Sequence, residues 1–125
     1  LAVKMKLHPV KTAIKGKRVI LIDDSIVRGT TSRMLVQLLR ESGAKEIHLR
    51  LSSPEIRYPC YFGIDTPTRD ELISNHLKSD ALARKIGADS VMFLPEEKLV
   101  SCVKKPKDYC LACFNGQYPV PIAAS

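Results

Sequence analysis

The sequence predicts an α/β fold in which about three strands of a parallel sheet are flanked by helices. Two observations favour this fold. An apolar block, an amphipathic segment and an alternating segment follow one another between Arg18 and Leu51, which is the order and length of a strand–helix–strand unit. A further apolar block, Ser90–Leu94, follows a second helical pattern. Strands joined in this way lie parallel, and the crossover between them is right-handed.

The first half of the chain supplies the strand–helix–strand unit. Residues 1–17 are basic and show no clean periodicity, so we expect a mobile lead-in there. Val19–Ile22 consists of β-branched residues and leucine, which is typical of a strand buried on both faces. A helix is predicted from about Ser32 to a C-cap at Gly43. Its apolar face is predicted from Met34, Leu35, Leu38 and Leu39. EIHLRL, residues 46–51, alternates as a strand does.

The second half begins with a long ordered loop, SSPEIRYPCYFGIDTP, over residues 52–67. Thr68–Glu71 has the capping-box pattern and predicts a helix that continues to Leu77. A second helix is expected from Ser79 to Gly87, and the third strand follows it. Pro95 suits the first position of a last short helix, and the residues from Lys104 are expected to form a tail.

Composition and charge narrow the class of protein. The chain has 125 residues, the size of one domain, and 20 Lys and Arg against 13 Asp and Glu, which gives a net charge of +7. This charge favours an anionic partner, either phosphate on a small molecule or a nucleic-acid backbone. No aromatic residues alternate with the basic ones, as a stacking platform for single strands requires. We find no secretory signal and no membrane-spanning run, and we expect a cytoplasmic protein.

Two carboxylates and an anion-binding pattern stand next to each other after the first strand. Asp23 and Asp24 end the strand, and a loop with Gly29 and three hydroxyl residues leads into the helix. A helix N-terminus attracts anions, although the same residues also suit an ordinary start with a Thr or Ser cap. A carboxylate about 4 Å from a phosphate costs about 1 kcal/mol in water and about 4 at a dielectric of 20. The aspartates therefore need another target, such as hydroxyl groups or Mg²⁺, and a sugar phosphate offers both kinds of group.

The stretch VILIDDSIVRGTTS resembles the phosphoribosyl pyrophosphate motif of the type I phosphoribosyltransferases. A longer match is similar to one branch of that family, the glutamine phosphoribosylpyrophosphate amidotransferases. It comprises GKRVILIDDSIVRGTTSRMLVQLLRESGAKEIHLRLSSP, YPCYFGIDTPTRDELI, IGADSVMFL and YCLACFNGQYP. The resemblance implies a partial type I phosphoribosyltransferase fold. It also implies an enzyme that makes 5-phosphoribosylamine from phosphoribosyl pyrophosphate and glutamine-derived ammonia, the first committed step of purine synthesis.

The resemblance also assigns residues and partners. It makes Asp23 and Asp24 the catalytic residues, which bind the ribose hydroxyls and Mg²⁺. It assigns the 5′-phosphate to a loop of seven residues, Ser25, Ile26, Val27, Arg28, Gly29, Thr30 and Thr31. Phosphoribosyl pyrophosphate is then the substrate, purine nucleotides are the expected regulators, and the parent enzyme is expected to be a homo-oligomer. No nucleic-acid or membrane partner is implied.

By the same resemblance, the chain corresponds to a C-terminal part of the parent enzyme. Residues 1–17 match the end of a flexible substrate loop, 18–94 part of the phosphoribosyltransferase core, and 95–125 a C-terminal helix with a cysteine-containing tail. The glutaminase domain and the first strands of the transferase sheet have no counterpart in the sequence. We therefore expect an exposed sheet edge and no activity from the chain alone.

The cysteines suggest a second kind of chemistry. Cys110 and Cys113 form a C-x-x-C pair, a spacing found in zinc sites, iron–sulfur sites and redox dithiols. Its position in a tail argues against a thioredoxin-like dithiol. The resemblance assigns Cys60, Cys110 and Cys113 as three ligands of a 4Fe-4S cluster whose fourth ligand lies elsewhere in the parent. Cys102 stands at helical spacing from apolar residues and is predicted to be buried.

Two other functions place similar residues at a strand end. A phosphoribosyl pyrophosphate-sensing transcription regulator shares the fold and a basic charge, but it should carry a DNA-binding helical module, and no such segment is apparent. A Mg²⁺-binding receiver domain also has an acidic pair. It needs a phosphoacceptor Asp at the end of a later strand and a Lys after another, whereas Ser52 and Pro95 follow the second and third predicted strands.

Overall fold

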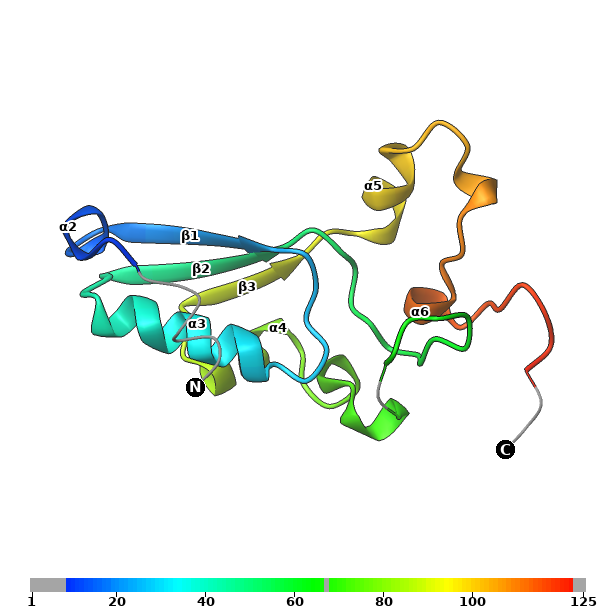
Figure 1. Ribbon diagram of the computed structural model, residues 1–125, viewed down its shortest axis with the longest axis horizontal. Helices are drawn as coiled ribbons and strands as arrows, with labels where there is room; N and C mark the ends of the chain where they lie inside the picture. Colours follow the sequence, from blue (N-terminus) through cyan, green and yellow to red (C-terminus); the bar gives the residue numbers. More distant parts are fainter. Residues whose placement is uncertain (1–8, 67, 123–125) are drawn as a thin grey trace.

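The computed structural model describes residues 9–66 and 68–122, and its centre is an open parallel sheet (Figure 1). The sheet has the order β1 (Arg18–Asp23), β2 (Glu46–Leu51) and β3 (Ser90–Phe93). Both neighbouring pairs run parallel. Helix α3 (Thr30–Glu41) connects β1 to β2, and helix α4 (Ser79–Ile86) precedes β3. The predicted α/β fold with three parallel strands and flanking helices is confirmed.

Helices α3 and α4 lie on the same side of the sheet, and the core fills the space between them and the strands (Figure 1). Ile47 and Leu49 of β2 and Leu82 of α4 are fully buried there. The opposite face of β1 is bare, since Ile20 is 65% exposed and Ile22 72% exposed. The prediction that this strand is buried on both faces is therefore wrong. Among the described residues, β1 has a neighbouring strand on one side only, as the expected exposed sheet edge requires.

Helix α3 begins and ends at glycines. Gly29 is its N-cap with φ of 77°, and Gly43 follows the C-cap residue Ser42 with φ of 89°. The predicted helix is confirmed, although it begins two residues earlier, at Thr30, and Gly43 lies one position after the C-cap. Its most buried residues are Ser32 and Val36, whereas the predicted face at Met34, Leu35, Leu38 and Leu39 is only half-buried. Helix α3 covers only one face of the sheet. A narrower stripe of its surface therefore faces the core than its leucines indicate.

The helix predicted from Thr68 to Leu77 is wrong. The structure has two short 3-10 turns instead, η1 (Arg69–Glu71) and η2 (Ile73–Asn75), with Leu72 extended between them. The Ile73 N–H donates to the carbonyl oxygen of Val27 at 2.9 Å, so it is not available to a continuous helix. Leu72 and Ile73 are both buried, and the break between the turns lets two consecutive side chains enter the core.

Shorter helices lie outside this layer. Helix α2 (Lys11–Ile14) falls within the predicted lead-in, where no regular structure was expected, and Ile14 packs against the core. Helix α5 (Glu96–Ser101) has Pro95 as its N-cap, one position before the predicted one. The tail contains η3 (Pro106–Asp108) and α6 (Ala112–Asn115), which the sequence did not indicate. No helix in the described ranges is long and apolar enough to cross a membrane.

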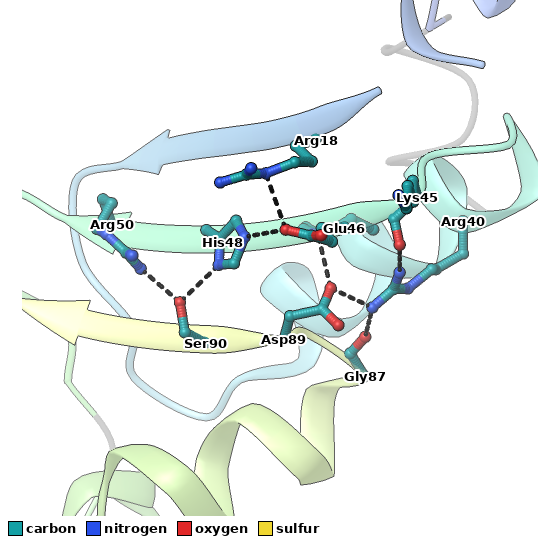
Figure 2. A network of polar contacts seen from close by, with 10 residues as sticks. Arg18, Arg40, Lys45, Glu46, His48, Arg50, Gly87, Asp89 and Ser90 are labelled. Carbon is teal, nitrogen blue, oxygen red and sulfur yellow. Dashed lines mark hydrogen bonds and ion pairs between the residues drawn. The ribbon is translucent and has the colours of Figure 1, made fainter. Parts of the chain in front are cut away.

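A network of polar contacts fastens the amino ends of β2 and β3 to the end of α3 (Figure 2). Arg40 of α3 donates from Nη2 to Asp89 Oδ2 at 2.6 Å and from Nη1 to the carbonyl oxygen of Lys45 at 3.0 Å. The Ile47 N–H donates to the same Asp89 oxygen at 2.6 Å. That backbone bond, and then Arg40, holds the pKa of Asp89 below its ordinary value. The network fixes the helix against the sheet at the end opposite the strand carboxyl termini.

Candidate functional site

The carboxyl ends of β1 and β2 meet at one edge of the sheet. The two strands are in register there, with Asp23 opposite Leu51. The backbone N–H and hydroxyl of Ser52 donate to the carbonyl oxygen of Asp23 at 3.0 and 3.2 Å. This contact fixes the backbone from which both aspartates project. Ligands of open α/β sheets bind at such an edge.

Each aspartate uses one carboxylate oxygen in a local hydrogen bond. Asp23 Oδ1 accepts from the N–H of Asp24 at 3.0 Å. Asp24 Oδ1 accepts from the N–H of Ser25 at 2.5 Å and from its hydroxyl at 3.3 Å. Within residues 9–66 and 68–122, no donor is bonded to the second oxygen of either carboxylate. Two oriented oxygens can therefore accept from hydroxyl groups or bind a cation.

The loop after β1 encloses an open hollow of about 260 Å³, lined by the ten consecutive residues 23–32. Its floor is the N-terminus of α3, which has no side-chain cap. The first N–H groups of a helix have no partner within the helix, so they can donate to an anion in the hollow. The cap is Gly29, which has no side chain to offer, and the alternative of an ordinary Thr or Ser cap is therefore wrong.

The structure brings every residue of the predicted sugar-phosphate site into this hollow, and adds Ser32. The residues contribute in different ways. Ile26 is buried in the core, so only its backbone can face a ligand. Thr30 and Thr31 are exposed at the first two positions of α3, where their hydroxyl groups can reach an anion together with the helix N–H groups. The carboxylates lie at one end of this continuous lining, and the helix N-terminus lies at the other.

Sequence reasoning missed the segment that supports the loop. Arg28 donates from Nε to Glu71 Oε1 at 3.0 Å, and this bond holds the pKa of Glu71 below its ordinary value. Next to it, the Ile73 N–H holds the carbonyl oxygen of Val27. A Cβ on Gly29 would lie 2.9 Å from Ile73 Cδ1, so the loop lies directly on this side chain. The one available signal, the capping-box pattern that contains Glu71, predicted a local role for this carboxylate.

The three cysteines assigned to a cluster lie in one region. The N–H groups of Arg57 and Tyr58 donate to the Cys113 carbonyl oxygen at 2.9 and 3.1 Å, which fastens the tail to the loop that carries Cys60. Burial raises the pKa of the Cys113 thiol, and the neighbouring Cys60 and Cys110 raise it further.

These thiols do not form a ready-made metal site. In the part of the chain that the structure describes, no three His, Cys, Asp or Glu side chains converge on a position where they could hold a metal ion. Thiolates are the usual ligands of an iron–sulfur cluster, but the three thiols are not arranged around a common position where a cluster would bind. Cys102 is exposed, so its predicted burial is wrong. Helix α5 ends at Ser101 and buries none of its residues, which leaves Cys102 as an exposed C-cap.

Comparisons with known proteins point to one group of enzymes. Over 122 residues the chain is 51% identical to the amidophosphoribosyltransferase of Methanocaldococcus jannaschii. The alignment covers 98% of this chain and 26% of the relative. A chloroplastic amidophosphoribosyltransferase of Arabidopsis thaliana is 53% identical over 119 residues, 94% of this chain and 21% of the relative. The chain thus spans about a quarter of the length of the curated relatives it matches. No family model matches the chain.

Solved structures agree with the sequence relatives. A structure described as the allosteric regulatory enzyme of purine biosynthesis aligns with a TM-score of 0.81 and 44% identity, over 93% of this chain and 27% of that one. The glutamine phosphoribosylpyrophosphate amidotransferase of B. subtilis, complexed with ADP and GMP, aligns with a TM-score of 0.80 and 44% identity, over 93% of this chain and 28% of that one.

Proposed function

We propose that this chain, a homologue of about a quarter of the amidophosphoribosyltransferase sequence, forms part of the domain that binds phosphoribosyl pyrophosphate in such an enzyme. Residues 18–94 would form a partial phosphoribosyltransferase core, preceded by the end of a substrate loop and followed by a helix and a cysteine-containing tail. The observation that carries the proposal is the pair of carboxylates at the edge of an anion-binding hollow. That pairing suits a ligand with hydroxyl groups at one end and phosphate at the other.

In the proposed reaction, ammonia from glutamine displaces pyrophosphate from the ribose. The loop from Ser25 to Thr31 and the N-terminus of α3 hold the 5′-phosphate. Asp23 and Asp24 accept the ribose hydroxyls, which fixes the ring beside the incoming ammonia. Positive charge develops on the ribose as pyrophosphate leaves, and the two carboxylates stabilise it. Mg²⁺ held by these carboxylates would neutralise charge on the departing pyrophosphate.

The cysteine region has a separate proposed role. Cys60, Cys110 and Cys113 would supply three thiolates to a 4Fe-4S cluster, and the fourth ligand would come from outside this chain. Support comes from the backbone bonds that hold the tail against the Cys60 loop. Iron and sulfide assays on an enzyme that contains this chain test the role. Substitution of Cys113 should remove the iron and the visible colour, and substitution of Cys102 should preserve both.

The proposal extends to partners and location. Purine nucleotides are candidate regulators, because the B. subtilis relative was solved with ADP and GMP. We also propose a homo-oligomeric parent enzyme in the cytoplasm, with no nucleic-acid or membrane partner. The relatives reported above are enzymes by name, which gives no support to the alternative of a transcription regulator.

The test of this function uses a chimaera. The matching quarter of the Methanocaldococcus jannaschii enzyme is replaced by this chain, and formation of phosphoribosylamine is measured with ammonia and with glutamine as nitrogen donor. Asp24→Asn should lower both rates, because the damage lies at the ribose. Glu97→Gln, on the exposed helix α5, is the matched control. Loss of the glutamine-dependent rate alone would refute the role assigned to Asp24.

A further inference from the structure

The phosphate loop has one cation of its own, and that cation is bonded to a carboxylate from a distant segment. Arg28 stands in the middle of the loop, and its Nε donates to Glu71 Oε1 at 3.0 Å. The other oxygen of Glu71 accepts from the Thr68 hydroxyl at 3.2 Å. The carboxylate therefore bridges the loop and the start of η1 with both of its oxygens.

This ion pair contributes little to the stability of the fold. The side chains of Arg28 and Glu71 are 54% and 49% exposed, and solvent weakens an ion pair at such a position. The buried core nearby is provided by other residues, Leu72 and Ile73 among them. An exposed acidic residue close to an anion site would also be unfavourable unless its charge were neutralised. Arg28 supplies that neutralisation, and the hydrogen bond lowers the pKa of the Glu71 carboxyl group.

The ion pair is the second of two ties on adjacent residues of the loop. The first is the bond from the Ile73 N–H to the carbonyl oxygen of Val27. Between them, these contacts hold the backbone that leads directly into Gly29, whose φ of 77° sets the direction of the first N–H groups of α3. A backbone tie at Val27 alone leaves the peptide after it free to turn. A side-chain tie at Arg28 restricts that freedom.

We propose that Glu71 is a positioning residue for phosphate binding, which acts through Arg28 to hold the loop in the shape that receives the phosphoryl group of a sugar phosphate. This inference rests on the proposed function of the loop. Preorganisation of this kind raises affinity because less ordering remains to be done when the ligand arrives. Glu71 does not touch the ligand, so its effect depends wholly on the presence of Arg28.

The test titrates the ¹⁵N-labelled chain with ribose 5-phosphate and follows the amide signals of residues 25–31 by NMR. In the unsubstituted chain these signals should shift and saturate. Glu71→Ala should raise the dissociation constant about three- to fivefold without changing the urea midpoint of unfolding. Glu71→Gln keeps an acceptor but loses the charge, so its dissociation constant should lie between those of Glu71→Ala and the unsubstituted chain. The dissociation constant of Glu97→Ala should equal that of the unsubstituted chain.

A double substitution separates positioning from a merely structural role. If Glu71 acts through Arg28, the variant with Arg28→Ala and Glu71→Ala binds no more weakly than Arg28→Ala alone. Additive losses, an unchanged dissociation constant in Glu71→Ala, or a loss of affinity matched by a lower urea midpoint would each overturn the inference. If the unsubstituted chain shows no shifts in residues 25–31, the proposed function of the loop fails first, and the inference fails with it.

Discussion

At the residue level, the hollow separates two kinds of chemistry that would otherwise conflict. The Asp23 carboxylate accepts from the N–H of Asp24, and the Asp24 carboxylate accepts from the N–H of Ser25, so one oxygen of each stays available among the described residues. The N-terminus of α3 lies at the other end of the same lining. In the proposed complex, the phosphate lies away from the carboxylates while the ribose bridges the two ends, which removes the repulsion that direct contact would produce.

The hydroxyl group of Thr30 provides a residue-level test of the phosphate end. Thr30→Val keeps the shape of the side chain and removes its donor. A hydrogen bond to a charged group contributes about 1.5–3 kcal/mol, so the affinity for phosphoribosyl pyrophosphate should fall about 10- to 150-fold. Titration calorimetry measures the change, with Thr12→Val on α2 as the control. Equal affinities for the Thr30 variant and the unsubstituted chain would show that this hydroxyl does not contact the ligand.

The cysteines should differ in reactivity. Burial raises the pKa of Cys113, whereas Cys102 is exposed at the end of α5. Because the thiolate is the reactive form, Cys113 should be alkylated more slowly than Cys102 at neutral pH. Mass spectrometry of peptides after timed exposure to iodoacetamide measures both rates. Equal rates, or faster modification of Cys113, would contradict the packing of the tail against the Cys60 loop.

At the level of elements, the contact between Gly29 and Ile73 couples helix α3 to the segment beneath its N-terminus. Gly29→Ala should destabilise the fold by about 1–3 kcal/mol, because the position has a left-handed φ and the new Cβ meets Ile73 Cδ1. Gly16→Ala has a similar φ of 74° and open space around it, so it isolates the backbone cost. Urea unfolding measures both variants.

The Ile73→Val background supplies the decisive comparison for this contact, because it removes Cδ1. Gly29→Ala should cost less there than in the unsubstituted chain. An identical cost in the two backgrounds would mean that the Ile73 side chain does not restrict the loop.

The hydrogen bonds that Asp89 accepts from the Ile47 N–H and then from Arg40 give the fold a pH dependence. The folded pKa of Asp89 is lowered, so its stabilisation is complete above the ordinary value of about 3.9 and is lost as the pH falls through the folded value. Because both side chains are partly exposed, Asp89→Asn should cost about 1 kcal/mol at pH 7, and the difference should shrink near pH 3. Urea unfolding at both pH values measures it. A difference of equal size at both would exclude this carboxylate as the titrating group.

Elements with a strong local pattern could be predicted, and those fixed by distant partners could not. Strand β2 alternates in sequence and is half-buried as its pattern indicates. The segment from Thr68 to Leu77 has an equally clear capping pattern but no helix, because Glu71 and Ile73 are bonded to the loop more than 40 residues earlier. Short helices such as α2 and α6 have too few residues for periodicity to show.

For the whole molecule, one face of the sheet and the outer edge of β1 are uncovered by the described residues, and the chain matches about a quarter of its longer relatives. The residues that line the hollow could be predicted from the sequence as one group because they are consecutive, from Asp23 to Thr31, at one strand end, and their binding roles stay a prediction. The supporting residues Glu71 and Ile73 could not, since no local pattern indicates which segment lies beneath a loop. The burial of a side chain also depends on which face of the sheet the helices cover. Ile20 and Ile22 lie on the uncovered face, so they are exposed although they are apolar.

A crystal structure of this chain with phosphoribosyl pyrophosphate and Mg²⁺ would test the proposed site by direct observation. We expect the 5′-phosphate against residues 25–31 at the N-terminus of α3, and the ribose hydroxyls within hydrogen-bonding distance of Asp23 and Asp24. A phosphate bound elsewhere, for example in the hollow lined by Arg57, Arg69 and Lys78, with the β1 loop empty, would contradict this expectation.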